Sequence, residues 1–145
     1  MKFPILILIL LSTMLPRNST AQSLADYQWK NRILLLVDAN SNTDALQSQL
    51  AELTSDKTAL KERDLLIFRV TPDAVYASDG NTSKLKAVNI YDDCGLDLDF
   101  KGTLLLGKDG GVKLKKPFEV SSQAVFDLID GMPMRRSEMR ESGKN

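Results

Sequence analysis

Apolar residues along the chain fall into short continuous runs that have the length of β-strands. Residues 32–38 (RILLLVD) and 64–71 (DLLIFRVT) are two such runs, and their unbroken hydrophobicity is typical of strands buried on both faces. A third run follows at residues 100–107 (FKGTLLLG). The sequence KDGG at 108–111 predicts a hairpin turn, because Asp-Gly and Gly-Gly adopt positive φ at low cost. Residues 112–115, with alternating apolar and basic side chains, predict a short fourth strand near a sheet edge.

Segments with helical spacing lie between these runs. Leucines share one face over residues 43–61, which predicts a long helix capped by Asp44 together with Gln47, with a bend at Thr54-Ser55. Residues 73–81 are rich in turn-forming residues. Three further helical segments are predicted: residues 82–92, residues 121–130 with Ser121 or Ser122 as cap and Gly131 as stop, and residues 132–140.

The predicted order of elements is β-α-β-α-β-β-α. Its first half is a parallel crossover unit, which handedness rules make right-handed, and its second half is an antiparallel hairpin followed by a helix. A flavodoxin-like sheet needs further alternation of strands and helices, which the hairpin at 108–111 contradicts. We therefore expect an α/β, thioredoxin-like fold with a four-stranded mixed sheet flanked by helices.

The N-terminal segment has the composition of a secretory signal peptide. It contains Lys2, an apolar run at residues 5–11, and small residues Ser19 and Ala21 at the positions that precede a cleavage site. The alternative is a membrane anchor, but the apolar run is well short of the roughly 20 residues that span a bilayer. We expect a signal peptide at residues 1–21, a folded domain at 22–140 and a frayed tail at 141–145. The protein would be periplasmic or secreted, without a membrane span after cleavage.

Charge and composition exclude several classes of function. The chain has 145 residues, a formal net charge of +0, one cysteine and no histidine. No strong field therefore points to nucleic acid or to an anionic membrane as a partner. Without histidine, Ser-His and Cys-His catalysis and histidine-based zinc sites are excluded within one chain. With a single cysteine, an intramolecular disulfide cannot form.

Cys94 is the one thiol on which redox chemistry could rest. In one interpretation it reacts with peroxide or joins two chains through an intermolecular disulfide. In the other it is an inert, partly buried thiol. Nearby carboxylates favour the inert form because negative charge raises the pKa of a thiol. These carboxylates belong to Asp92, Asp93, Asp97 and Asp99.

Two metal sites can be considered, and neither is favoured. Asp97 and Asp99 imitate the start of a calcium-binding loop, but Lys101 and Lys108 occupy positions where that loop needs oxygen ligands. The methionines of residues 132–139 could bind Cu(I), yet methionines beside a closing helix more often fill gaps in the core. We expect no metal and no cofactor.

Two clusters remain as binding candidates. The turn after the first strand could orient a polar ligand through its side chains and the N–H groups of the helix that follows, although capping and turn chemistry explain the same residues. This cluster consists of Ser41, Asn42, Thr43 and Asp44. Basic residues near the C-terminus could form an anion-binding patch, although neighbouring acids favour a solvated surface. This second cluster consists of Arg135, Arg136 and Arg140.

Five parts of the chain share a resemblance to known proteins: RILLLVDA, the long helix predicted after it, ERDLLIFRV, LLLGKDGGVKL and especially LIDGMPMRRSEMR. Together they resemble one group of exported bacterial proteins with a thioredoxin-like domain of unknown function, of the P-DUDES type. Related domains occur in vertebrate secreted sushi-repeat and matrix proteins. The resemblance covers residues 24–140 and is most specific at 107–112 and 132–140. It implies a fold, an export route and a role in binding or adhesion, but no catalytic residues.

A more distant resemblance links LLLGKDGGV to peroxiredoxins and thiol-disulfide thioredoxins. In those enzymes a cysteine lies between the first strand and its helix, where the helix N-terminus lowers the thiol pKa. The corresponding residues 39–44 contain no sulfur, and residues 100–102 (FKG) replace the proline that normally precedes the third strand. We therefore expect a non-catalytic binding module with an envelope or extracellular protein as partner. The alternative is an atypical peroxiredoxin-like or thiol-dependent enzyme that uses Cys94 alone.

Overall fold

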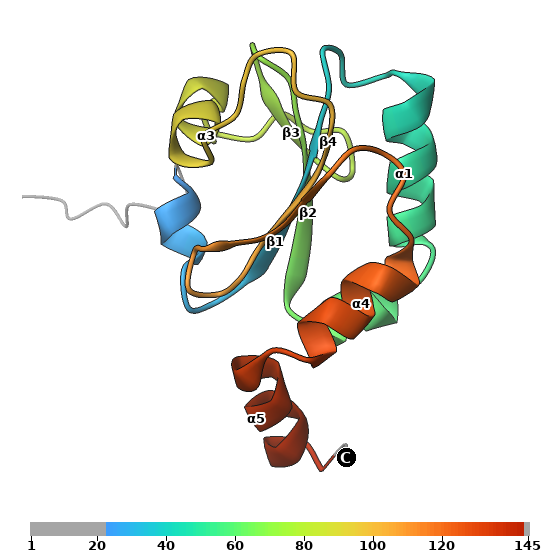
Figure 1. The fold of residues 1–145 in the computed structure, drawn as a ribbon, viewed down its shortest axis with the longest axis vertical. Helices are drawn as coiled ribbons and strands as arrows, with labels where there is room; N and C mark the ends of the chain where they lie inside the picture. Colours follow the sequence, from blue (N-terminus) through green and yellow to red (C-terminus); the bar gives the residue numbers. More distant parts are fainter. Residues whose placement is uncertain (1–22, 144–145) are drawn as a thin grey trace, which may run out of the picture.

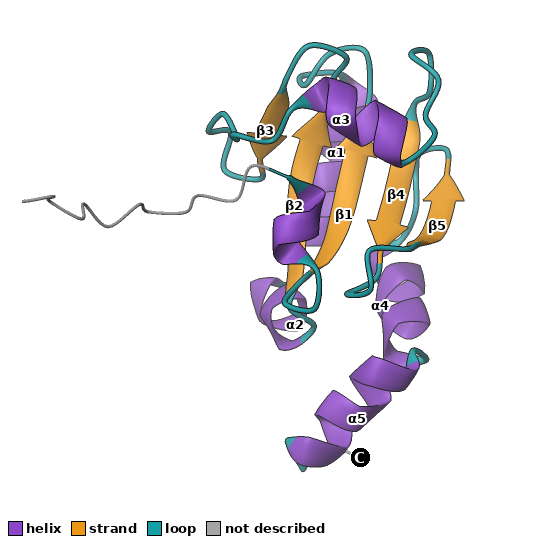
Figure 2. Ribbon diagram, turned by 90° about the vertical axis from the view of Figure 1, so that its left-hand side faces the viewer, coloured by secondary structure: helices purple, strands orange, loops and turns teal. Residues whose placement is uncertain are grey.

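Five strands form one mixed sheet in the order β3-β2-β1-β4-β5 in the computed structural model, which describes residues 23–143 (Figure 2). The central strand β1 pairs in parallel with β2 and antiparallel with β4. The edge strands β3 and β5 pair antiparallel with β2 and β4. The strands span β1 Arg32–Val37, β2 Leu65–Val70, β3 Val75–Ala77, β4 Gly102–Leu106 and β5 Val112–Lys116.

Helices cover both faces of this sheet (Figure 1). The short 3₁₀ helix η1 and helix α3 lie on one face, and α1 and α4 lie on the other. Helix α5 continues from α4 beyond the end of the sheet. The helices span η1 Leu24–Tyr27, α1 Asp44–Thr54, α2 Lys57–Glu62, α3 Ala87–Asp93, α4 Ser122–Asp130 and α5 Pro133–Glu141.

Alternation along β1 divides the core into two clusters. Leu34 and Leu36 face α1 and α4, where they pack with Leu46. Ile33 and Leu35 face α3 and pack on the opposite side of the sheet. All six residues of β1 are buried, as the continuous apolar run predicts for a strand covered on both faces.

The sheet has one strand more than the sequence predicts. Strand β3 lies inside residues 73–81, a stretch rich in turn-forming residues in which no strand was predicted. Its three residues pair with the end of β2, and Tyr76 forms an isolated bridge with Thr82. The predicted four-stranded sheet is therefore wrong in its strand count, although the mixed α/β class is confirmed.

Helix boundaries also differ from the prediction. The long helix over residues 43–61 is two helices, α1 and α2, because Asp56 accepts a hydrogen bond from the Ala59 N–H and starts a new helix. Helix α3 begins five residues later than expected, at Ala87. In contrast, Ser121 caps α4 as predicted, since its Oγ accepts from the Ala124 N–H.

Helix α5 is a two-turn helix with Pro133 in its first turn, in the segment where a short helical turn was expected. It includes Glu141, the first residue of the expected tail. None of the helices in residues 23–143 is long and apolar enough to cross a bilayer. The signal peptide expected at residues 1–21, and residues 144–145 of the tail, lie outside the described part of the chain.

Candidate functional site

The carboxyl ends of β1 and β2 meet at one edge of the sheet, beside the first turn of α1 (Figure 1). Open α/β sheets bind ligands at this edge, and the first N–H groups of a helix have no acceptor within the helix. Four of the predicted candidates lie here together with two residues that the sequence did not single out. We call this region the carboxyl edge and define it by Asp38, Ser41, Asn42, Thr43, Asp44 and Arg69.

Asp38 fixes the turn that connects β1 to α1. Its side chain is buried, with the residue only 3% exposed. One carboxylate oxygen accepts from the Ala39 N–H at 2.6 Å, and the other accepts from the Thr43 hydroxyl at 2.6 Å. Lys101 lies farther away, with its Nζ 3.9 Å from Oδ1 and its side chain exposed. The carboxylate is therefore used mainly to hold the turn.

Thr43, not Asp44, caps helix α1. The Thr43 side chain accepts a hydrogen bond from the Leu46 N–H at 3.3 Å. The capping pair predicted from Asp44 and Gln47 does not form, because Gln47 Nε2 lies 3.4 Å from the Ser41 carbonyl oxygen instead. Asn42 and Asp44 are exposed at this end of the helix. Asn42 Oδ1 accepts a long hydrogen bond from Gln47 Nε2 at 3.4 Å, and both exposed side chains can be reached by a ligand.

Arg69 is a buried cation at the same edge. The residue is 8% exposed, and its Nε is buried without a hydrogen-bond partner. Its Nη1 donates one long hydrogen bond, 3.5 Å, to the Ser41 carbonyl. Its guanidinium carbon lies 6.0 Å from the centroid of the Tyr76 ring. No ion pair among residues 23–143 includes Arg69.

A second unpartnered polar group, the hydroxyl of Tyr91, is buried on the α3 side of the sheet. Tyr91 is 5% exposed, and its oxygen has no hydrogen-bond partner. Burial raises the pKa of this phenol, and the negative charges of Asp38 and Asp73 raise it further. The phenol therefore stays neutral, and its O–H remains a donor near the end of β1.

Cys94 lies away from the carboxyl edge, directly after α3. Its side chain is half-buried and lines a cavity of about 220 Å³ between η1 and the turn that joins β4 and β5. Burial raises the pKa of the thiol, the charge of Asp93 raises it further, and Lys115 opposes them. The carboxylate effect expected from the sequence is present, but burial is the larger cause.

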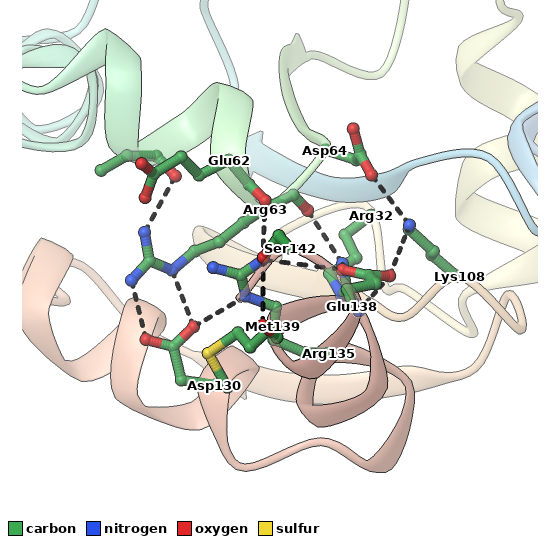
Figure 3. A network of polar contacts seen from close by, with 11 residues as sticks. Arg32, Glu62, Arg63, Asp64, Lys108, Asp130, Arg135, Glu138, Met139 and Ser142 are labelled. Atoms are coloured by element: carbon green, nitrogen blue, oxygen red, sulfur yellow. Dashed lines mark hydrogen bonds and ion pairs between the residues drawn. The ribbon is translucent and has the colours of Figure 1, made fainter. Parts of the chain in front are cut away.

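The three C-terminal arginines do not form one patch. Arg135 is 6% exposed, and its side chain donates to Asp130 and to the Glu62 carbonyl (Figure 3). Arg136 and Arg140 are exposed. Arg135 is thus a structural residue that attaches α5 to the rest of the domain, and it is not available to an anion in solution.

No metal site is evident in the described residues. Within residues 23–143, no group of three or more His, Cys, Asp or Glu side chains could hold a metal ion. Asp97 and Asp99, considered above as calcium ligands, are both exposed. Met134 is exposed and Met132 packs against the core of the α4 face.

The family model described as a domain of unknown function, DUF4174, matches residues 23–138. The chain belongs to the DUF4174 family. A zebrafish (Danio rerio) protein called coiled-coil domain-containing protein 80 is 30% identical over 134 residues. That match covers 80% of this chain but only 15% of the zebrafish protein, so the DUF4174 chain corresponds to a small part of that relative.

Solved structures confirm the thioredoxin-like fold of this DUF4174 domain. The reduced 2-Cys peroxiredoxin of Plasmodium vivax matches with a TM-score of 0.58 over 79% of this chain and 84% of that one. Thioredoxin peroxidase I of Plasmodium yoelii matches with a TM-score of 0.52 over 84% of this chain and 81% of that one. Both are 16% identical to this chain, so they show the fold alone.

Sequence reasoning found the turn of the carboxyl edge but missed two of its residues. Asp38 is an acid directly after a buried strand, and this position was a usable signal. Arg69 interrupts the apolar run of β2, where a charged residue on a buried strand needs a partner or a ligand. That interruption was the signal that could have identified it.

Proposed function

We propose that this DUF4174 protein is an exported, non-catalytic binding module of the P-DUDES type, related to the domains of vertebrate secreted sushi-repeat and matrix proteins. The carboxyl edge is its binding surface, and its partner is a protein of the envelope or the cell exterior. The near-zero net charge gives no reason to expect nucleic acid.

One observation carries this proposal. The turn between β1 and α1 contains no sulfur, and the Asp38 carboxylate bonds internally to Ala39 and Thr43 at this position. The exposed side chains Asn42 and Asp44 stand around a helix N-terminus whose donors have no acceptor within the helix. This arrangement suits binding and offers no nucleophile with a base beside it.

Site-specific photo-crosslinking in the producing cells tests the binding role. A photoreactive residue at Asn42 is expected to give one discrete adduct with a second protein. The matched control places the same residue at Ser55, which is exposed at the other end of α1. An adduct from Asn42 alone supports the proposal. Adducts from both positions, or from neither, contradict it.

A second function, thiol-dependent catalysis by Cys94 alone, is suggested by the cavity that this side chain lines. Peroxide consumption by the wild-type protein and by Cys94→Ser separates the two functions. Negligible and equal turnover supports the binding module. Turnover that disappears in Cys94→Ser supports the enzyme and contradicts the first proposal.

Export is tested by the N-terminus of the protein recovered from the producing organism. Cleavage after Ala21 would leave Gln22 as the first residue. N-terminal sequencing of protein from the periplasm or the medium is expected to begin at Gln22. Protein found only in the cytoplasm with an intact N-terminus would contradict export.

A further inference from the structure

We propose that the carboxyl edge binds an oxyanion group, with Arg69 as its cationic ligand. This inference rests on the binding role proposed above and names the chemistry that the surface recognises. It starts from the burial of Arg69, because removing a guanidinium from water without an acidic partner has a free-energy cost.

The internal contacts of Arg69 compensate this cost only in part. Its Nε is buried with no partner, and its Nη1 reaches one carbonyl, that of Ser41, at 3.5 Å. The Tyr76 ring lies 6.0 Å from the guanidinium carbon, at the limit of a favourable cation–π contact. Within residues 23–143, no ion pair supplies a carboxylate to this side chain.

The position of Arg69 adds a second source of positive potential. The Ser41 carbonyl that it contacts belongs to the turn immediately before α1, a helix of 11 residues. The first N–H groups of a helix attract anions, and Thr43 satisfies only that of Leu46. A buried arginine and a helix N-terminus therefore point at the same short turn.

Two carboxylates at this turn, those of Asp38 and Asp44, could compete with an anionic ligand for Arg69, and neither pairs with it. Both oxygens of Asp38 accept hydrogen bonds from within the turn, so this carboxylate does not serve Arg69. Asp44 is exposed at the helix start and reduces the potential without filling the site. The planar guanidinium matches carboxylate, sulfate and phosphate oxygens, so the shared ligand chemistry is an oxyanion.

The sheet topology explains why the side chain is held here. Arg69 faces the same side as Leu65 and Ile67, which pack under α1 and α4. The neighbouring turn leaves little room, since a Cβ at Gly80 would lie 3.1 Å from Arg69 Nη2. The guanidinium is therefore restrained between the start of α1 and the β3 turn, and little side-chain entropy remains to be lost on binding.

The test measures binding of inorganic phosphate, inorganic sulfate and acetate to the full protein, with chloride at equal ionic strength as reference. At least one oxyanion is expected to raise the melting temperature beyond the chloride effect. Arg69→Gln is expected to weaken its binding at least about tenfold, because it removes the charge-assisted hydrogen bonds from the guanidinium to the anion. The three anions distinguish a carboxylate ligand from a phosphate or sulfate ligand.

Arg136→Gln is the matched control, because it removes one exposed positive charge from α5. It is expected to bind the oxyanion like the wild type. Equal weakening in both variants, or no specific oxyanion effect in the wild type, overturns the inference.

Amide chemical shifts of the wild-type protein keep the test decisive if Arg69→Gln does not fold. Oxyanion titration is expected to shift the amides of residues 41–45, and shifts confined to α5 overturn the inference. An Asn42 crosslink without any oxyanion binding would leave the binding module intact and reject only its proposed ligand chemistry.

Discussion

Arg32, the first residue of β1, forms a two-point ion pair with Glu138 of α5, which is 106 positions farther along the chain. Its Nη1 and Nη2 donate to the two carboxylate oxygens at 3.1 and 3.2 Å, and Arg32 is 1% exposed (Figure 3). Lys108 donates to the same carboxylate at 2.6 Å. Arg135 is the one buried residue of α5, so this helix is attached mainly through charged groups.

Replacement of Glu138 by Gln is expected to destabilise the domain by about 2–3 kcal/mol, because it removes the negative charge shared by buried Arg32 and Lys108 and replaces one acceptor oxygen by an NH2 group. Urea unfolding at neutral pH measures this loss. Glu141→Gln on the same helix is the control, since Glu141 is exposed. Equal effects of the two substitutions would show that the buried ion pair does not stabilise the attachment of α5.

Acid is expected to weaken the same attachment. Burial of Glu138 favours its neutral form, but hydrogen bonds and charge from Arg32 and Lys108 outweigh it, so the pKa of Glu138 lies below its usual range. Burial likewise favours the neutral form of Asp130, but hydrogen bonds and charge from Arg63 and Arg135 together outweigh it. The pKa of Asp130 therefore also lies below its usual range. A depressed folded-state pKa stabilises the protein above the pKa of the unfolded chain.

This stabilisation is complete above about pH 5 and is lost as the pH falls through the lower pKa values of the folded state. The free energy of unfolding, measured by urea titration across this range, is expected to fall more steeply for the wild type than for the Asp130→Asn, Glu138→Gln double variant. Parallel curves would contradict the assignment of these two carboxylates.

The strands that could be predicted were those with long apolar runs. Burial on both faces requires continuous hydrophobicity in β1, and this signal is local. Strand β3 has only three residues and lies among turn formers, so its pairing with β2 decides its conformation. The break between α1 and α2 occurs because Asp56 caps a new helix. The leucine spacing continues through this break, so it predicted one helix instead of two.

The candidate site could be predicted only where its residues are neighbours in the sequence. The turn at residues 41–44 was found because strand, turn and helix signals coincide there. Arg69 is placed at the carboxyl edge by its contact with Ser41, which is 28 positions away in the sequence. Arg135 was expected to bind an anion, but its side chain donates to the Glu62 carbonyl, 73 positions away. Neither contact leaves a local pattern.

Gly102 is expected to tolerate no side chain at the start of β4. A Cβ at this position would overlap the carbonyl oxygen of Lys116 on β5. Gly102→Ala should therefore destabilise the sheet by about 1–3 kcal/mol, as overpacking generally does. Gly131→Ala is the control, because a Cβ there meets nothing closer than 3.5 Å and the backbone φ is −78°. Thermal unfolding compares the two, and equal melting temperatures would contradict the expected overlap.

Cys94 is expected to react slowly with thiol reagents at neutral pH. Burial, with the charge of Asp93, raises the pKa of its thiol, so little of the reactive thiolate is present. The rate of reaction with a disulfide reagent should be several-fold lower in the folded protein than in urea. The reaction rate of the folded protein should still increase with pH at values where an ordinary thiol is already fully ionised, because the pKa of Cys94 is raised.

Two charge variants separate electrostatics from simple burial of Cys94. Asp93→Asn should lower the thiol pKa and speed the reaction, because it removes the negative charge that opposes ionisation. Lys115→Gln should raise the pKa and slow it, since Lys115 favours the thiolate. Rate–pH profiles of both variants, with Cys94→Ser as the blank, measure the shifts.

Opposite displacements of the two profiles fit this electrostatic account. Identical profiles would leave burial as the sole cause, and a wild-type rate above that of the urea-unfolded chain would identify an activated thiol.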